Sequence, residues 1–179
     1  VFNESNSNTE VHELYLDLVS IGTGALFVEE GSGGFEKDSV HFNTMHIAEY
    51  YIHENVSGYI DTLYRKYKLS ARQAVQEFGE ENVGEKVLEA AKDKPDKMFN
   101  FIHAVEPLED YERALGKGAT KLPFHSCHVC EEDKMTVRAG GYNEFPYRVP
   151  RWSKATGEIF GRSPSYNALP DIKTLNKAV

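Results

Sequence analysis

The sequence predicts an α+β fold, rich in strands, with short helices interspersed and a further helix beginning at its end. Runs typical of strands follow one another with helical periods placed irregularly between them, which does not match regular βαβ winding. Of the 179 residues, 40% are hydrophobic and 27% are charged, which is ordinary for a globular chain. This length favours one domain with a substantial core. We therefore expect a domain over residues 1–164 and the start of a helix over 165–179.

The first helix is predicted before residue 22 by apolar residues at helical spacing, with Thr9 or Asn8 as the cap and Gly22 as the end. The apolar residues of this pattern are Val11, Leu14, Leu18 and Val19. A short buried strand is expected over Ala25 to Glu29, and a flexible turn at Gly31 to Gly34.

The middle of the chain predicts a hairpin followed by two helices. Residues 45–54 and 59–68 form the two strands, joined at Asn55 to Gly58. Ser70 and Gln73 have capping-box spacing, and Gly79 ends the helix that follows. A weaker helix covers 83–91, and strands are expected near 98–106, 122–131, 134–139 and 145–152.

The last forty residues combine prolines, aromatic residues and arginines without helical or simple strand periodicity. Proline favours extended backbone, so Tyr142 to Ser153 should form an extended or edge segment, and Gly157 and Gly161 then enclose a tight turn with Glu158. Asn167 is the expected cap of the final helix, and Pro170 should lie in its first turn. An apolar stripe starts there with Leu169, Ile172, Leu175 and Val179. We expect Val179 to be an artificial end with a frayed last turn.

Charge is distributed unevenly along the chain. Residues 134–179 contain eight basic and three acidic residues, or +5, whereas residues 1–133 contain 12 basic and 25 acidic residues, or −13. A simple DNA-binding domain would be basic overall. An acidic body with a basic segment fits self-association or a surface past which DNA moves, and it also fits an unevenly charged solvated surface. No stretch is long and apolar enough to predict a membrane partner.

The residues that could carry chemistry do not form a convincing site. His125, Cys127, His128 and Cys130 are zinc-ligand types, but side chains alternate on a strand, so the first two should face away from the last two. We therefore expect no metal site, and two cysteines make no disulfide framework. No orienting residue indicates a Cys–His nucleophile. The Gly22 to Gly24 segment precedes a strand, whereas phosphate loops follow one. No catalytic residue, cofactor or bound metal is predicted.

Two segments resemble the head-to-tail connector (portal) proteins of short-tailed bacteriophages. The C-terminal segment carries Arg151-Trp152, Gly157-Glu158, Gly161 to Pro164 and Ala168 to Asn176, a long pattern that is specific to this family. Upstream, Gly22 to Val28 matches a Gly-Thr-Gly followed by an apolar strand. The two matches lie about 120 residues apart in the family's order, so the resemblance spans nearly the whole chain. Whole portal subunits are much longer than this chain.

The resemblance implies a structural subunit and not an enzyme. Residues 1–164 would be a wing-like domain and 165–179 the start of a stem helix. Subunits would form a dodecameric ring at one capsid vertex of the virion, after assembly in the host cytoplasm. The implied partners are the terminase motor, tail and adaptor proteins, capsid and scaffold, and double-stranded DNA that is packaged and ejected through the channel.

The candidate subunit or DNA contacts are Arg148, Arg151, Trp152 and Arg162. Trp152 could stack on Arg151, and the more favoured expectation is that it fills a core against the following turn. Glu158 and Arg162 could form an ion pair within the turn. Two other functions stay open, namely a nucleic-acid-binding domain that uses the basic 134–179 segment and a small zinc-binding domain.

Overall fold

The computed structural model describes residues 5–30, 40–108 and 122–178. The chain divides into two compact units, one made of residues 1–48 and 146–179 and the other of residues 49–145. Helices and antiparallel sheets are mixed along the chain, which confirms the predicted α+β class. In the described part of the chain, no helix is long and apolar enough to cross a bilayer.

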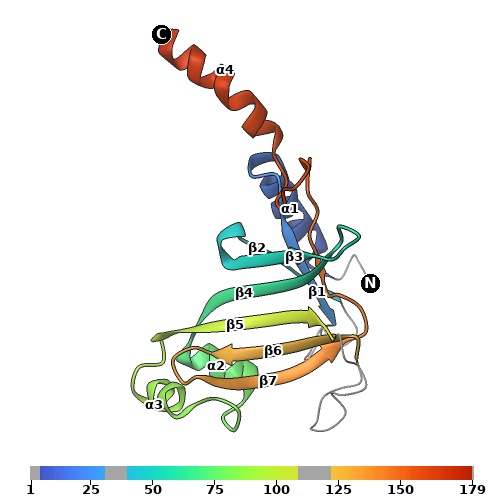
Figure 1. Ribbon diagram of the computed structural model, residues 1–179. Coiled ribbons are helices and arrows are strands. Elements are labelled where there is room, and N and C mark those ends of the chain that lie inside the picture. Colours follow the sequence, from blue (N-terminus) through green and yellow to red (C-terminus); the bar gives the residue numbers. More distant parts are fainter. Residues whose placement is uncertain (1–4, 31–39, 109–121, 179) are drawn as a thin grey trace. The chain divides into compact units, whose positions relative to one another are not determined.

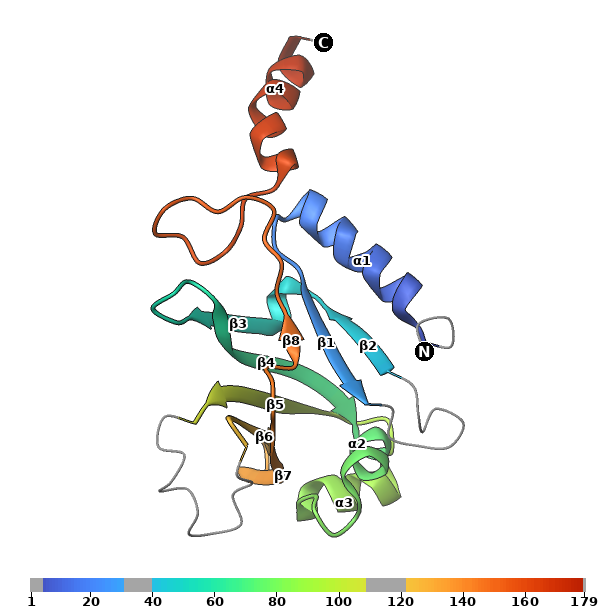
Figure 2. The same ribbon diagram turned by 90° about the vertical axis from the view of Figure 1, so that its right-hand side faces the viewer.

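The discontinuous unit contains a small antiparallel sheet in which, among the described residues, the strand order is β2-β1-β8 (Figure 2). Helix α1 spans Ser7–Ser20, β1 Ala25–Glu30, β2 Val40–Met45, β8 Tyr147–Arg148 and α4 Pro164–Ala178. Leu14 and Leu18 of α1 pack against Leu26 of β1 and Phe42 of β2. The predicted first helix and strand are thus confirmed, and Gly22 follows the helix with φ of 96°. Asn6 is the cap residue in place of Thr9 or Asn8.

Strand β2 was not predicted from the sequence. The single strand expected over 45–54 is in fact divided between the end of β2, a short 3-10 helix and β3. Met45 ends β2, a short 3-10 helix η3 spans Ile47–Glu49, and β3 begins only at Tyr50. Pairing with β1 runs from Ala25 opposite Met45 to Glu30 opposite Val40. The side chain of Asn6 adds two bonds to Phe42, accepting from its N–H at 3.0 Å and donating to its carbonyl oxygen at 2.7 Å. Residues 40–45 therefore form a strand because of contacts with residues distant in the sequence.

Strand β8 is much shorter than the predicted 145–152 strand because prolines flank it. Pro146 and Pro150 have no N–H to donate, but their carbonyls accept from Val28 at 3.0 Å and Gly24 at 3.3 Å. The position of β8 beside β1 confirms the middle of the expected Tyr142 to Ser153 edge segment, whereas Tyr142 itself ends β7.

The continuous unit is built on a second antiparallel sheet, whose order among the described residues is β3-β4-β5-β6-β7 (Figure 1). Strand β3 spans Tyr50–Glu54, β4 Ile60–Ser70, β5 Met98–Pro107, β6 Phe124–Cys130 and β7 Met135–Tyr142. Helices α2, Ala71–Phe78, and α3, Glu85–Asp93, cover one face of this sheet. The predicted hairpin at Asn55 to Gly58 is confirmed by the pairing of β3 with β4.

Local sequence signals account for the two helices of this unit. Ser70 Oγ accepts from the N–H of Gln73 at 3.3 Å and Gln73 Oε1 accepts from the N–H of Ser70 at 2.9 Å, so the capping box is confirmed. Gly79 ends α2 with φ of 85°. The core beneath the helices includes Phe99 and Phe101, and burying each of these rings stabilises the unit by roughly 2–3 kcal/mol. The predicted turn at Gly31 to Gly34 lies outside the described residues.

Candidate functional site

Two segments far apart in the sequence cross at the point from which α4 starts. The backbone N–H of Gly161 donates to Thr23 Oγ1 at 2.7 Å, and the N–H of Trp152 donates to the carbonyl of Gly22 at 2.9 Å. Thr23 is fully buried and pairs with Arg151 as an isolated β-bridge. We call this arrangement, formed by residues 22–24 with 151–153 and 161–163, the crossing.

Glycine is required on both sides of the crossing. A Cβ on Gly22 would lie 2.4 Å from the backbone N of Ser163 and 2.5 Å from the carbonyl carbon of Arg162. A Cβ on Gly161 would lie 2.3 Å from the carbonyl oxygen of Gly22. Because these neighbours are backbone atoms, they cannot move aside as a flexible side chain would. The two glycines therefore permit the close approach of the two segments.

Helix α4 is capped directly at the crossing. Ser163 is buried, and its Oγ accepts from the N–H of Tyr166 at 3.0 Å. Pro164 occupies the first helical position, where its missing N–H costs nothing. The hydroxyl of Ser165 then donates to the carbonyl of Val19 at the end of α1, at 2.8 Å. The helix is therefore fixed at its root by its own cap and by α1.

The prediction of a final helix is confirmed, but the predicted first residue of that helix is wrong. Ser163 caps it and not Asn167, so the helix begins one turn earlier. Pro170 consequently lies inside the helix and not in its first turn. A proline there removes the N–H that would bond to the carbonyl four residues earlier, which weakens the helix locally. Val179 lies outside the described residues.

The turn before α4 is held by the two arginines that were expected to be contacts. Arg162 donates to both carboxylate oxygens of Glu158, from Nε at 3.0 Å and from Nη2 at 2.6 Å, which confirms the predicted ion pair. These hydrogen bonds lower the pKa of Glu158 and raise that of Arg162. Arg151 donates from Nη1 to the carbonyl of Ile159 at 3.1 Å. Both guanidinium groups thus stabilise the turn.

The structure brings three of the four candidate contacts together. Arg151, Trp152 and Arg162 belong to the crossing, while Arg148 lies on β8, opposite Leu26. Trp152 has 57% of its surface exposed, so the expectation that it fills a core is wrong. Its backbone takes part in the crossing and its indole faces solvent.

Large apolar side chains are exposed on α1, on the 158–163 turn and on α4, and only those on α4 were predicted from the sequence. A groove of about 620 Å³ lies between the 158–163 turn, the end of α1 and the start of α4. Beside the apolar residues of α4, large exposed side chains come from α1 and from the turn. On α1, the 158–163 turn and the described part of α4, the exposed residues are Tyr15, Leu16, Val19, Ile159, Phe160, Tyr166, Leu169, Ile172 and Leu175. The exposed apolar residues of α1 could have been predicted from the sequence, because the apolar residues of this helix cover more than one side of it.

The histidines and cysteines of β6 are divided as predicted. Ser126 and His128 point towards His103 on β5, which places His128 on the opposite side from His125 and Cys127. The rings of His103 and His128 stack with centroids 3.9 Å apart and planes 9° apart. Among the described residues no group of three or more His, Cys, Asp or Glu side chains could hold a metal ion.

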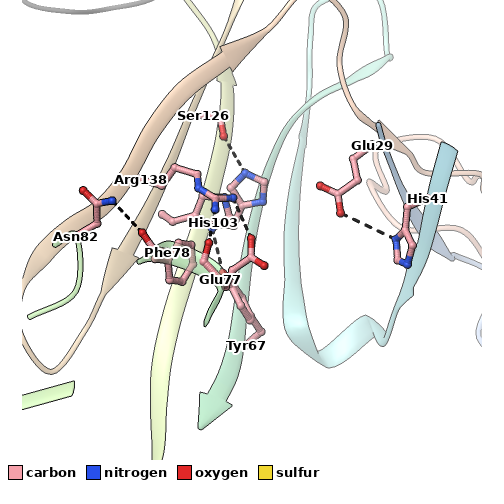
Figure 3. A network of polar contacts seen from close by, with 10 residues as sticks. Glu29, His41, Tyr67, Glu77, Phe78, Asn82, His103, Ser126 and Arg138 are labelled. Atoms are coloured by element: carbon pink, nitrogen blue, oxygen red, sulfur yellow. Dashed lines mark hydrogen bonds and ion pairs between the residues drawn. The ribbon is translucent and has the colours of Figure 1, made fainter. Parts of the chain in front are cut away.

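The stacked pair is held in neutral form by its surroundings. His103 Nε2 shares a hydrogen bond of 2.9 Å with Ser126 Oγ (Figure 3). His128 Nδ1 shares a hydrogen bond of 3.0 Å with the hydroxyl of Tyr67. Burial is the main cause that lowers the pKa of His103 to about 2 and that of His128 to about 4. Burial also raises the pKa of the Cys127 and Cys130 thiols. Neutral thiols are poor nucleophiles, so nothing at this position favours Cys–His catalysis.

Comparisons with known proteins cover the whole chain. A family model described as bacteriophage head to tail connecting protein matches residues 1–179. The chain is 27% identical over 179 residues to the probable portal protein of Bordetella phage BPP-1. It is 30% identical over 181 aligned residues to the portal protein of Salmonella phage epsilon15. Each alignment includes 98% of this chain and 31% of the relative, so the chain spans about a third of the length of these curated relatives.

The crossing joins the two segments that carry the resemblance, and the family match includes both of them. On these grounds the chain belongs to the family of bacteriophage head-to-tail connecting proteins.

Proposed function

We propose that this chain is the wing-like part and the first stem helix of a portal subunit of a short-tailed phage or prophage. Residues up to Ser163 would form the wing and α4 the start of the stem. Twelve subunits would close into a ring at one capsid vertex, around a channel that double-stranded DNA crosses during packaging and ejection. The terminase motor, tail and adaptor proteins, capsid and scaffold would dock on this ring.

One observation carries this proposal, namely a helix that is anchored at its root and has little to pack against among the residues that the structure describes. Residues 165–177 of α4 are exposed throughout, although Leu169, Ile172 and Leu175 are apolar. A helix of 15 residues with an internal proline is marginal without tertiary packing. The crossing nevertheless fixes its first turn. A fixed root and an uncovered apolar stripe fit a stem helix that neighbouring subunits stabilise.

The role we propose is geometric and not catalytic. A head-to-tail contact uses two different surfaces of the subunit, and such contacts close into a ring when the rotation permits. The acidic body and the basic segment after residue 134 supply unlike charges for such a contact. ATP hydrolysis would belong to the motor.

Assembly of the full-length subunit tests the proposal. We expect rings visible by electron microscopy, with a single mass by mass photometry, that weaken as salt rises because surface charges become screened. Reversal of Arg148, Arg151 and Arg162 to Glu should weaken assembly further. Arg162→Glu also sets a carboxylate beside Glu158, so each variant must first be shown to unfold cooperatively. A wild-type subunit that folds but stays monomeric at all concentrations and salt levels would refute the proposal.

The charge of the 134–179 segment supports a second candidate function, nucleic-acid binding. In that case Arg148, Arg151, Lys154 and Arg162 would contact phosphates. A titration with double-stranded DNA at several salt concentrations tests it, because each phosphate contact makes the dependence of affinity on salt steeper. Weak binding without a salt slope would exclude this function.

A further inference from the structure

Helix α1 has an apolar side that the described residues of its unit leave uncovered. Leu14 and Leu18 face the sheet and are buried. Tyr15, Leu16 and Val19 lie on the other side of the helix, with 61%, 56% and 46% of their surfaces exposed. At 100° per residue these three fall within about 100° of one another, so they form one continuous face. We call Tyr15, Leu16 and Val19 the outer face of α1.

One edge of this outer face is acidic, and the first 30 residues of the sequence contain six carboxylates and no lysine or arginine. On α1 itself, Glu13 and Asp17 border the side of Leu16. Asp17 is half-buried, and burial raises its pKa, while Glu13 is exposed. Glu13 is therefore the carboxylate at this edge that a partner could reach most easily.

Helix α4 carries a similar face with the opposite charge beside it. The α4 stripe consists of Leu169, Ile172 and Leu175, with 43%, 48% and 66% of their surfaces exposed. Lys173 and Lys177, both exposed, lie along one edge of the stripe, and Asp171 lies along the other. The lysine edge complements the acidic edge of α1.

We propose that the outer face of α1 in one copy packs against the α4 stripe of a neighbouring copy, with Glu13 opposite Lys173 and Lys177. This contact rests on the proposed ring and names the surfaces that form it. Pairing α1 with α1 would bring carboxylates together, and pairing α4 with α4 would bring lysines together, so the charges favour the unlike pair. A contact between two different surfaces is the head-to-tail kind that a ring requires.

In the described part of one chain, the outer face of α1 and the α4 stripe do not cover one another. Inside the subunit, the end of α1 meets the start of α4 through the Ser165 hydroxyl and the Val19 carbonyl. With that junction made, the outer face and the stripe both remain exposed. Each copy thus offers one acidic-edged face and one basic-edged face, and a second copy offers the complement of each.

Cysteine crosslinking in the full-length subunit tests the contact directly. Leu16→Cys and Leu175→Cys are made separately on a Cys127→Ser background, which retains buried Cys130 and serves as the control. After mild oxidation of assembled rings, we expect a crosslinked dimer from an equal mixture of the two variants. Neither variant alone should give it, because each interface then contains a single added thiol.

A charge exchange provides the second test, since all of its residues are exposed. Glu13→Lys, or Lys173→Glu with Lys177→Glu, should raise the concentration at half-assembly by roughly three- to tenfold, as expected for one or two exposed ion pairs. Combining all three changes should restore assembly to within about twofold of wild type. The matched control is Glu89→Lys, the same charge change at an exposed position of α3, which should leave assembly unaltered.

The outcomes separate this contact from the ring itself. Rings with a mixed-variant crosslink and charge rescue support both. Rings without that crosslink, or a crosslink from either variant alone, overturn the α1–α4 contact and leave the ring standing. Failure of the triple exchange to restore assembly also overturns the contact. Folded wild-type subunits that never form rings overturn the proposed function, and with it this inference.

Discussion

Replacing Gly22 by alanine should destabilise the discontinuous unit strongly. The residue has φ of 96°, which side chains of L-residues disfavour by about 1–2 kcal/mol. Its Cβ would also lie 2.4 Å from the Ser163 N and 2.7 Å from the Gly161 carbonyl oxygen. Forcing closely packed backbone apart costs a further 1–3 kcal/mol, roughly. We therefore expect the free energy of unfolding to fall by roughly 2–5 kcal/mol.

Urea unfolding followed by tryptophan fluorescence measures the loss of stability in the discontinuous unit, to which Trp152 belongs. The chain has one tryptophan, and Trp152 bonds through its backbone to Gly22 itself. With a urea slope of about 1–2 kcal/mol per M, the midpoint should fall by more than about 1 M. Far-UV circular dichroism recorded in parallel reports the strands and helices of the whole chain.

Matched glycines separate backbone strain from the steric contact. Gly157 has φ of 83° but open space around its Cβ position, so Gly157→Ala should cost only the strain, about 1–2 kcal/mol. Gly140→Ala meets neither strain nor contact and should be nearly neutral. If Gly22→Ala shifts the midpoint no more than Gly157→Ala, close approach at the crossing does not contribute to stability.

Three further predictions concern the continuous unit. The histidine pair should make the unit acid-sensitive, because folded pKa values below the ordinary 6.5 mean that the unfolded state takes up protons first. The stability that the pair contributes is complete above about pH 6.5 and is lost down to about pH 4 for His128 and about pH 2 for His103. His128 alone should account for roughly 3 kcal/mol of this loss, and His128→Gln should make the profile of unfolding free energy against pH less steep, with His103 supplying the remaining slope. Ser70→Ala removes the capping box of α2 and should lower the free energy of unfolding by about 1 kcal/mol in urea titrations. Chelator treatment should leave the melting temperature unchanged, and a fall of many degrees would restore the zinc hypothesis for the 125–130 segment.

Local signals made parts of the fold predictable. The capping box at Ser70 and Gln73, the hairpin at Asn55 to Gly58 and the glycine after α1 each depend on neighbours in sequence, and each is confirmed. Strand β2 depends instead on pairing with β1 and on the Asn6 side chain, which lies 36 residues from its partner Phe42. Such pairing leaves little trace in local composition.

The candidate site was predictable in its residues but not in its geometry. The arginine–tryptophan pair and the glycines were identified from the sequence, yet nothing local indicates that Gly161 meets Thr23 across 138 positions. The start of α4 was misplaced because Asn167 and Ser163 are both good caps, and only the buried position of Ser163 decides between them. The outer face of α1 was overlooked because Val19 was assigned to the core pattern.

The crossing also has a consequence for how the chain folds during synthesis. Residues 49–145 are complete as a unit before the ribosome has added Gly161, Arg162 and Ser163. In the discontinuous unit, in contrast, residues 1–48 cannot form the crossing until Gly161, Arg162 and Ser163 have left the ribosome. Closing so long a loop is slow compared with forming local hairpins. We expect the inserted unit to fold first on the nascent chain, so that α4 gains its anchor only when the polypeptide has grown past the crossing.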